Sequence, residues 1–113
     1  MSASGDLAED AAAEFLKARG LKLIERNYRC RFGEIDLVMS DGRTLVFVEV
    51  RYRRSDAFGG AVESITEGKR RKLLQAARHY MASSRDFPAC RFDAVLLSGD
   101  KKELQWLENA FGE

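Results

Sequence analysis

The stretch GEIDLV, Gly33 to Val38, followed after a short turn by LVFVEVRYRR, Leu45 to Arg54, decides how this sequence folds. Both segments have the apolar character and length of β-strands, and Asp41-Gly42 between them is a turn signal typical of a β-hairpin. Each segment nevertheless contains a carboxylate, Asp36 in the first and Glu49 in the second. A carboxylate within a strand that covers a core is costly unless it has a partner, so both acids require an explanation.

The register of this hairpin determines whether the two acids meet. A two-residue loop at Asp41-Gly42 makes them diagonal neighbours on one face of the sheet. A four-residue loop, in which Ser40 faces Leu45, places them directly opposite each other with Cβ atoms about 5 Å apart. Arg51 follows Glu49 by two residues and projects from the same face, because strand side chains alternate. An odd loop would separate these charges.

The other face of both strands is uniformly apolar and is predicted to cover the core. Its residues are Ile35, Leu37 and Met39 in the first strand and Val46, Val48 and Val50 in the second. A slip of one residue would move a whole apolar set to the opposite side of the sheet, so this pattern favours an even loop. Three charges then share one surface.

Patterns in the rest of the chain predict a single domain, residues 1–113, of alternating helices and strands. A first helix is expected from Asp6 to Arg19, and its helical spacing is carried by Leu7, Ala11, Ala12, Phe15 and Leu16. A second helix should follow Ser64-Ile65-Thr66-Glu67, which has the form of a capping box, with an apolar stripe of Leu73, Leu74, Ala77, Tyr80 and Met81. Strands are expected at Leu21–Tyr28, Glu34–Met39, Thr44–Arg51 and Cys90–Leu97.

The order of these elements predicts an α/β fold. A strand, a crossover helix and a further strand imply a parallel pair, so we expect a mixed sheet covered by helices. The last amphipathic segment, Leu104 to Phe111, has no decisive periodicity. No apolar run approaches the ~18 residues needed to cross a bilayer, and no signal peptide is recognisable, so we expect a cytoplasmic protein without a membrane partner.

Two converging carboxylates repel each other, and a divalent cation is their natural partner. Oxygen ligands that leave positions for water suit Mg²⁺ or Mn²⁺, and such an ion can orient a water and neutralise charge during phosphodiester hydrolysis. The alternative is a structural ion cluster in which Asp36 and Glu49 pair with Arg51. The spacing of the residues alone gives a metal site and a structural ion cluster roughly equal odds.

Basic residues near the acids predict contact with nucleic acid, although the net charge is only +1. Such groups can follow a phosphate backbone, whereas a run of charges on a helix is more often a solvated face. The candidates are Arg51, Arg53 and Arg54 after the third strand, and Lys69 and Lys72, which are three apart in the second helix. Tyr52 and Phe58 could stack on bases or anchor their own loop, and His79 is expected to be a packing or surface residue.

Four motifs stand in a consistent order along almost the whole chain: Gly33 to Val38, Phe47 to Val50, Arg91 to Asp93 and Asn109 to Phe111. Together they resemble the YraN family, bacterial proteins related to archaeal Holliday-junction resolvases. The resemblance implies a restriction-endonuclease-like three-layer α/β/α fold in which Asp36 and Glu49 bind the metal. Glu9 matches the helical glutamate of the family, and its other interpretation is a capping interaction with Asp6.

The chain departs from this family at Arg51, where the resemblance leads us to expect a lysine that positions or activates the attacking water. A guanidinium cannot lose a proton near neutral pH, although it can grip a phosphate through two parallel hydrogen bonds. Lys69 or Lys72 from the second helix could occupy the vacated position.

The leading functional interpretation is a metal-dependent endonuclease that binds DNA rather than RNA, with branched DNA as one candidate substrate. One rival is a catalytically weak nucleic-acid-binding module, because the motif lysine is replaced by Arg51. The other rival is an adaptor for protein partners with a vestigial site. The related resolvases also suggest a homodimer, because a two-fold axis suits a symmetric junction.

Overall fold

Two helices and five strands make up the part of the chain that this computed structural model describes, residues 3–53, 66–83, 89–99 and 103–111. In chain order they are α1 (Ala3–Ala18), β1 (Lys22–Cys30), β2 (Gly33–Asp41), β3 (Thr44–Arg53), α2 (Glu67–Ala82), β4 (Ala89–Ser98) and β5 (Glu103–Phe111). The expected α/β alternation is confirmed, and the segment near the C-terminus is a strand. Neither described helix is both long and apolar enough to cross a membrane.

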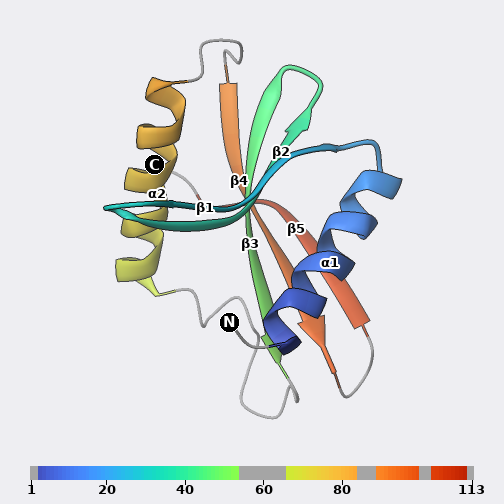
Figure 1. The fold of residues 1–113 in the computed structure, drawn as a ribbon. Helices are drawn as coiled ribbons and strands as arrows, with labels where there is room; N and C mark the ends of the chain where they lie inside the picture. Colours follow the sequence, from blue (N-terminus) through green and yellow to red (C-terminus); the bar gives the residue numbers. More distant parts are fainter. Residues whose placement is uncertain (1–2, 54–65, 84–88, 100–102, 112–113) are drawn as a thin grey trace.

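The strands form one mixed sheet in the order β1-β2-β3-β4-β5. Only β3 and β4 are parallel, because α2 connects them as a crossover, and the other neighbouring pairs are antiparallel. The sheet lies between the two helices, with α1 on one face and α2 on the other (Figure 1). The predicted mixed sheet covered by helices is therefore confirmed.

Each face of the sheet has its own apolar core. On the α2 side the buried residues are Ile35, Val38, Leu45, Phe47, Leu73, Ala76, Ala77, Phe92, Ala94 and Leu96. On the α1 side they are Ala12, Ala13, Leu16, Leu21, Leu37, Met39, Val46, Val48 and Val95. Because both faces are covered, the central strands read as near-continuous apolar runs rather than as a polar and apolar alternation.

The hairpin of β2 and β3 turns at Gly42 and Arg43. Ser40 pairs with Leu45 and Asp41 with Thr44, so the predicted register that brings the two acids opposite each other is confirmed. The predicted two-residue loop at Asp41-Gly42 is wrong by one residue. Gly42 has a φ of 61°, a conformation that glycine adopts without strain and that matches a tight hairpin turn.

The pairing of β2 with β3 ends one residue before the acids, at Leu37 and Val48. Beyond this point the side chain of Asp36 takes the place of a backbone carbonyl as hydrogen-bond acceptor, because its Oδ2 accepts the Val50 N–H at 2.9 Å. Ile35 then packs on the α2 side although Leu37 packs on the α1 side. The predicted common face of Ile35 and Leu37 is therefore wrong, since the strict alternation breaks at Asp36.

Helix α1 begins earlier and turns differently from the prediction. It starts at Ala3, so Asp6 lies inside the helix and is not its N-cap. Leu7 is 67% exposed and Ala11 is also exposed, whereas the buried stripe consists of Ala8, Ala12, Ala13 and Leu16. Small alanines allow the helix to lie close to the sheet, which favours this face over the one that carries Leu7.

Helix α2 starts at Glu67, and its N-cap is Thr66, whose hydroxyl accepts the Lys69 N–H at 3.2 Å. The predicted cap at Ser64 is therefore wrong, and Ser64 itself lies outside the described residues. The predicted apolar stripe of α2 is confirmed, because all five of its residues pack in or against the α2-side core.

A fully buried carboxylate, Asp93, ties β4 to β5. Its oxygens accept hydrogen bonds from Trp106 Nε1 at 2.9 Å, from the Asn109 backbone N–H at 2.9 Å and from Arg91 Nε at 3.1 Å. Asn109 has a φ of 52°, and the strand pairing shifts beside Asp93. Two of the four motifs, Arg91 to Asp93 and Asn109 to Phe111, thus meet in one hydrogen-bond network.

Candidate functional site

The two candidate acids converge on the α2 side of the sheet. Glu49 on β3 is only 2% exposed, and its Oε2 lies 2.9 Å from Lys69 Nζ and 3.2 Å from Arg51 Nε. Asp36 on β2 is close enough to Glu49 for the two carboxyl groups to share a hydrogen bond. The structure thus brings together Asp36, Glu49, Arg51 and Lys69, which come from three separate elements.

The carboxylate of Glu49 is neutralised but incompletely bonded. Lys69 and Arg51 contact Oε2 without the alignment of a full hydrogen bond, and the one hydrogen bond that Glu49 makes with a described side chain near it is the proton shared with Asp36. The Nε of Arg51 is buried in the same unsatisfied state. A buried oxygen without an aligned donor is expensive in free energy, so this atom retains capacity for a ligand.

Burial raises the pKa of Asp36 to about 8, and the adjacent carboxylate of Glu49 adds to this increase. The hydrogen bond from Val50 acts in the opposite direction and lowers the pKa, because it favours the charged form. At neutral pH, without a metal, Asp36 therefore holds a proton next to Glu49. A cation that binds both groups has to displace that proton.

Glu9 lies near the pair but has its own partner. Its Oε1 is 3.4 Å from Arg26 Nη2, and Arg26 also forms an ion pair with Asp10. The negative charge of Glu9 is one of the smaller causes of the raised pKa of Asp36, so Glu9 acts on the site electrostatically. The capping interaction with Asp6 is not its role, because Asp6 is not the N-cap of α1.

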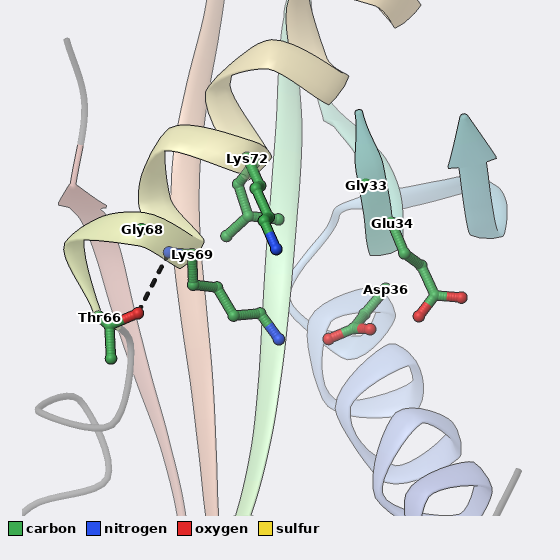
Figure 2. A pocket seen from close by; sticks show the side chains of 8 residues that line it. Gly33, Glu34, Asp36, Thr66, Gly68, Lys69 and Lys72 are labelled. Carbon is green, nitrogen blue, oxygen red and sulfur yellow. Dashed lines mark hydrogen bonds between the residues drawn. The ribbon is translucent and has the colours of Figure 1, made fainter. Parts of the chain in front are cut away.

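A cavity of about 380 Å³ opens beside the acids between the start of β2 and the start of α2. Figure 2 shows Lys69 and Lys72 reaching from α2 on one side, with Asp36 and Glu34 from β2 on the other. The remaining lining residues are Gly33, Thr66, Gly68 and Leu73. The cavity therefore has one basic wall at a helix N-terminus and one acidic wall.

The other candidate residues are placed less centrally or cannot be placed. Tyr52 is 46% exposed and lines a separate cavity with Leu7, Ala8 and Leu97, so it does not border the acids. Arg54 and Phe58 lie outside the described residues, as does the side chain of Arg53. His79 is exposed and accompanies Tyr28, as expected for a surface residue.

Sequence reasoning missed Asn27, which lies beside Asp36 in the sheet. Its neighbours Arg26 and Tyr28 pair with Leu37 and Ile35, the residues that flank Asp36. Asn27 has a φ of 55°, and its buried Oδ1 has no hydrogen bond among the described residues. An asparagine within a predicted strand was the available signal, since asparagine tolerates this backbone region better than most residues.

The donor set fits a hydrated hard cation but does not form a complete cage. No group of three acidic, histidine or cysteine side chains in the described ranges is arranged to hold a metal ion. Asp36 and Glu49 offer two carboxylates, and a cation that binds Oε2 of Glu49 would replace its contacts with Lys69 and Arg51. Mg²⁺ is commonly held by one or two carboxylates, with water and substrate phosphates as its remaining ligands.

Comparison with known proteins gives a consistent result. A family model described as "Uncharacterised protein family UPF0102" matches residues 8–97. The chain is 56% identical over 118 residues to a UPF0102 protein of Nitrosomonas europaea, covering 100% of this chain and 99% of that protein. It is 58% identical over 108 residues to a UPF0102 protein of Nitrosospira multiformis, covering 95% and 91% of the two chains.

Proposed function

The chain belongs to the UPF0102 family, which is YraN-like, and from this premise and the geometry of its site we propose that it is a metal-dependent endonuclease acting on DNA. The proposal includes a restriction-endonuclease-like arrangement of the helix, sheet and helix layers. The observation that carries it is the buried Glu49, whose unsatisfied oxygen lies beside Asp36. Asp36 in turn lines a cavity with a basic wall.

Asp36 and Glu49 would hold the cation. Bound Mg²⁺ or Mn²⁺ would activate a water and neutralise charge on the phosphate. Both acids come from strands in the covered part of the sheet, so their positions are fixed by the core on either side. The Val50 N–H holds Oδ2 of Asp36 and leaves its other oxygen for the ion or the proton.

Lys69 takes the role that the family resemblance assigns to a lysine at the position of Arg51. Its Nζ lies 2.9 Å from Glu49, so it is beside the acids although it comes from α2 rather than β3. An ammonium there can stabilise negative charge that develops on the phosphate and the attacking water. Arg51, 3.2 Å from the same oxygen, is suited to grip a phosphate oxygen.

The cavity is suited to receive the phosphodiester. Lys69 and Lys72 line it, and Thr66 and Gly68 place the N-terminus of α2 there. A helix N-terminus and two ammonium groups favour an anion, whereas the acids opposite would repel one unless a cation lies between them. The two walls therefore complement a phosphate that is bridged to the acids by a metal ion.

A second candidate function is DNA binding without cleavage. The two cations beside Glu49 favour it, because they neutralise the carboxylate without a metal. In that case the acids and bases form a structural ion cluster, and the basic wall alone contacts DNA.

Incubation of the purified protein with supercoiled plasmid and with branched DNA separates these candidates. An endonuclease cleaves in Mg²⁺ or Mn²⁺ but not in EDTA, and loses cleavage in Asp36→Asn and in Glu49→Gln. The exposed Glu103→Gln is the matched control and should leave cleavage unchanged. DNA binding that survives both substitutions, without cleavage by the unmodified protein, would support the second candidate.

Arg51→Lys adds a further test of the same site. Gain of cleavage in an otherwise inactive protein would show that the arginine disables an intact metal site. If neither form cleaves DNA nor binds it, the endonuclease proposal is overturned and an adaptor role is favoured.

A further inference from the structure

A cluster of aromatic rings joins the tip of the β1–β2 hairpin to α2. Phe32, in the turn between Cys30 and Gly33, has its ring centroid 5.8 Å from that of His79 in a T-shaped contact. The Tyr28 hydroxyl lies 2.6 Å from His79 Nδ1. Figure 1 shows this hairpin reaching across α2.

The cluster has an inner part and an outer part. The inner rings anchor the hairpin, because Tyr28 packs edge-on against Tyr80, with centroids 5.0 Å apart, and both contact the α2-side core. The outer part is accessible, since Phe32 is only partly buried and His79 and Arg31 are exposed. The Arg31 guanidinium lies 4.8 Å from the Phe32 centroid. The outer rings are therefore not needed to fill the core.

The outer rings do not line the cavity beside the acids, but each is connected to it through its own element. Phe32 directly precedes Gly33, which lines the cavity beside the acids. His79 follows Lys72, another lining residue, by seven positions on α2. Seven helical residues span about 10.5 Å, or roughly three steps of ~3.4 Å along a stacked strand. A nucleotide close to a phosphate in the cavity can therefore reach the rings.

We propose that Phe32, His79 and Arg31 bind an unpaired nucleobase of the DNA strand whose phosphate lies in the cavity; this proposal rests on the proposed function. An aromatic ring beside a guanidinium is a stacking platform for any base. The faces of a base become available only when it leaves the duplex. The preferred substrate is therefore DNA with a single-stranded segment next to the cleaved bond, rather than continuous duplex.

The test measures binding in EDTA, so that cleavage does not contribute. Fluorescence anisotropy gives the dissociation constants for a labelled single-stranded oligonucleotide and for the duplex of the same sequence. Phe32→Leu, which keeps apolar bulk but removes the ring, should weaken single-strand binding about tenfold and duplex binding less than about twofold. Phe32→Trp should retain single-strand binding. Leu7→Ala, which removes an exposed apolar side chain from α1 on the other side of the sheet, is the control and should change neither constant.

A second measurement uses the unmodified protein and so does not depend on the folding of a variant. Single-stranded oligonucleotides with one 2-aminopurine should show a fluorescence change on binding at the probe position that stacks, because the base exchanges its neighbours in the strand for the protein rings. No fluorescence change at any probe position, or an equal loss of single-strand and duplex binding in Phe32→Leu, would overturn the inference. The proposed function survives that outcome if metal-dependent cleavage remains, and it fails separately if cleavage is absent while stacking is observed.

Discussion

Two buried carboxylates on neighbouring strands, Asp93 on β4 and Glu49 on β3, have opposite environments. Asp93 is 0% exposed, and its two oxygens accept well-formed hydrogen bonds from Arg91, Trp106 and Asn109. Glu49 is 2% exposed, but its Oε2 has two cations nearby and no aligned donor. Glu49 also lies next to Asp36, which borders a cavity.

The difference separates a structural acid from an acid that can bind a ligand. A carboxylate whose lone pairs are all used stabilises the fold and has nothing to offer an ion. A carboxylate that is buried, neutralised and still unsatisfied has spare capacity at a place where charge is costly. Substitutions of Glu49, Asp93, Lys69 and Asp36 test the two sides of this contrast.

Glu49→Gln should have the largest effect, a loss of DNA cleavage of at least about 100-fold. The amide keeps the size of the side chain but removes the charge that holds a cation. Stability should fall by at most about 1 kcal/mol, because Lys69 is 41% exposed on its side chain and can turn to water. Cleavage and thermal unfolding of the same preparation check both statements. Unchanged cleavage would make Glu49 a second structural acid.

Asp93→Asn should produce the opposite result, a loss of about 3 kcal/mol of unfolding free energy, or roughly 10 °C in Tm. Either position of the new amide nitrogen faces donors, namely Trp106 and Arg91 in the place of Oδ2 or Asn109 and Arg91 in the place of Oδ1. Asp41→Asn is the matched control, because Asp41 contacts the same arginine at 3.1 Å from an exposed position. Its cost should stay below about 1 kcal/mol. Equal costs for the two variants would contradict the structural role of Asp93.

Lys69→Ala should reduce cleavage by about 10- to 100-fold, because it removes the ammonium beside Glu49. It should also strengthen the binding of Mn²⁺ measured by calorimetry, since the internal counter-ion of Glu49 is gone. Adding Arg51→Lys to this variant should restore part of the cleavage from the β3 side. Weaker Mn²⁺ binding in Lys69→Ala would show that the lysine supports the site only structurally.

Asp36→Asn should change the pH dependence of stability in EDTA. Folded Asp36 keeps its proton until about pH 8, whereas the unfolded chain loses it near the ordinary pKa, so the folded state binds more protons in between. This group therefore lowers the unfolding free energy as pH rises from about 4 to 8. The variant should gain at least about 1 kcal/mol over the unmodified protein between pH 5 and 9. Urea unfolding at several pH values tests this, with Glu103→Gln as the control that should show no such gain.

The sequence predicted the elements whose signals are strong and local. The hairpin, α2 and β4 follow from apolar periodicity and turn residues, and their positions are confirmed. The predicted face of α1 was partly right: Ala12 and Leu16 are buried and Phe15 packs against the core, whereas Leu7 and Ala11 are exposed. Alanines are too small and too uniform to mark which side of a helix is buried. The segment Leu104 to Leu107, in which Gln105 interrupts the apolar residues, suited either a strand or a helix, and pairing with β4 makes it a strand.

The candidate site was only partly accessible to sequence reasoning. The opposed acids follow from the hairpin register, which local spacing defines. The break in strand alternation at Asp36 does not follow from local spacing, because it depends on a side chain that takes the place of a backbone carbonyl. The contact of Lys69 with Glu49 joins residues 20 apart and is a tertiary feature that chain order can only suggest. The network around Asp93 likewise joins two motifs, Arg91 to Asp93 and Asn109 to Phe111, whose physical role the family resemblance did not explain.

The hydrogen bond from the Val50 amide to Asp36 gives the site a built-in spectroscopic probe. Its nitrogen and proton resonances respond directly to whether the carboxyl group carries a proton or a cation. A titration followed at this single backbone position in nitrogen-15-enriched protein would therefore report the occupancy of the site without any substrate or turnover.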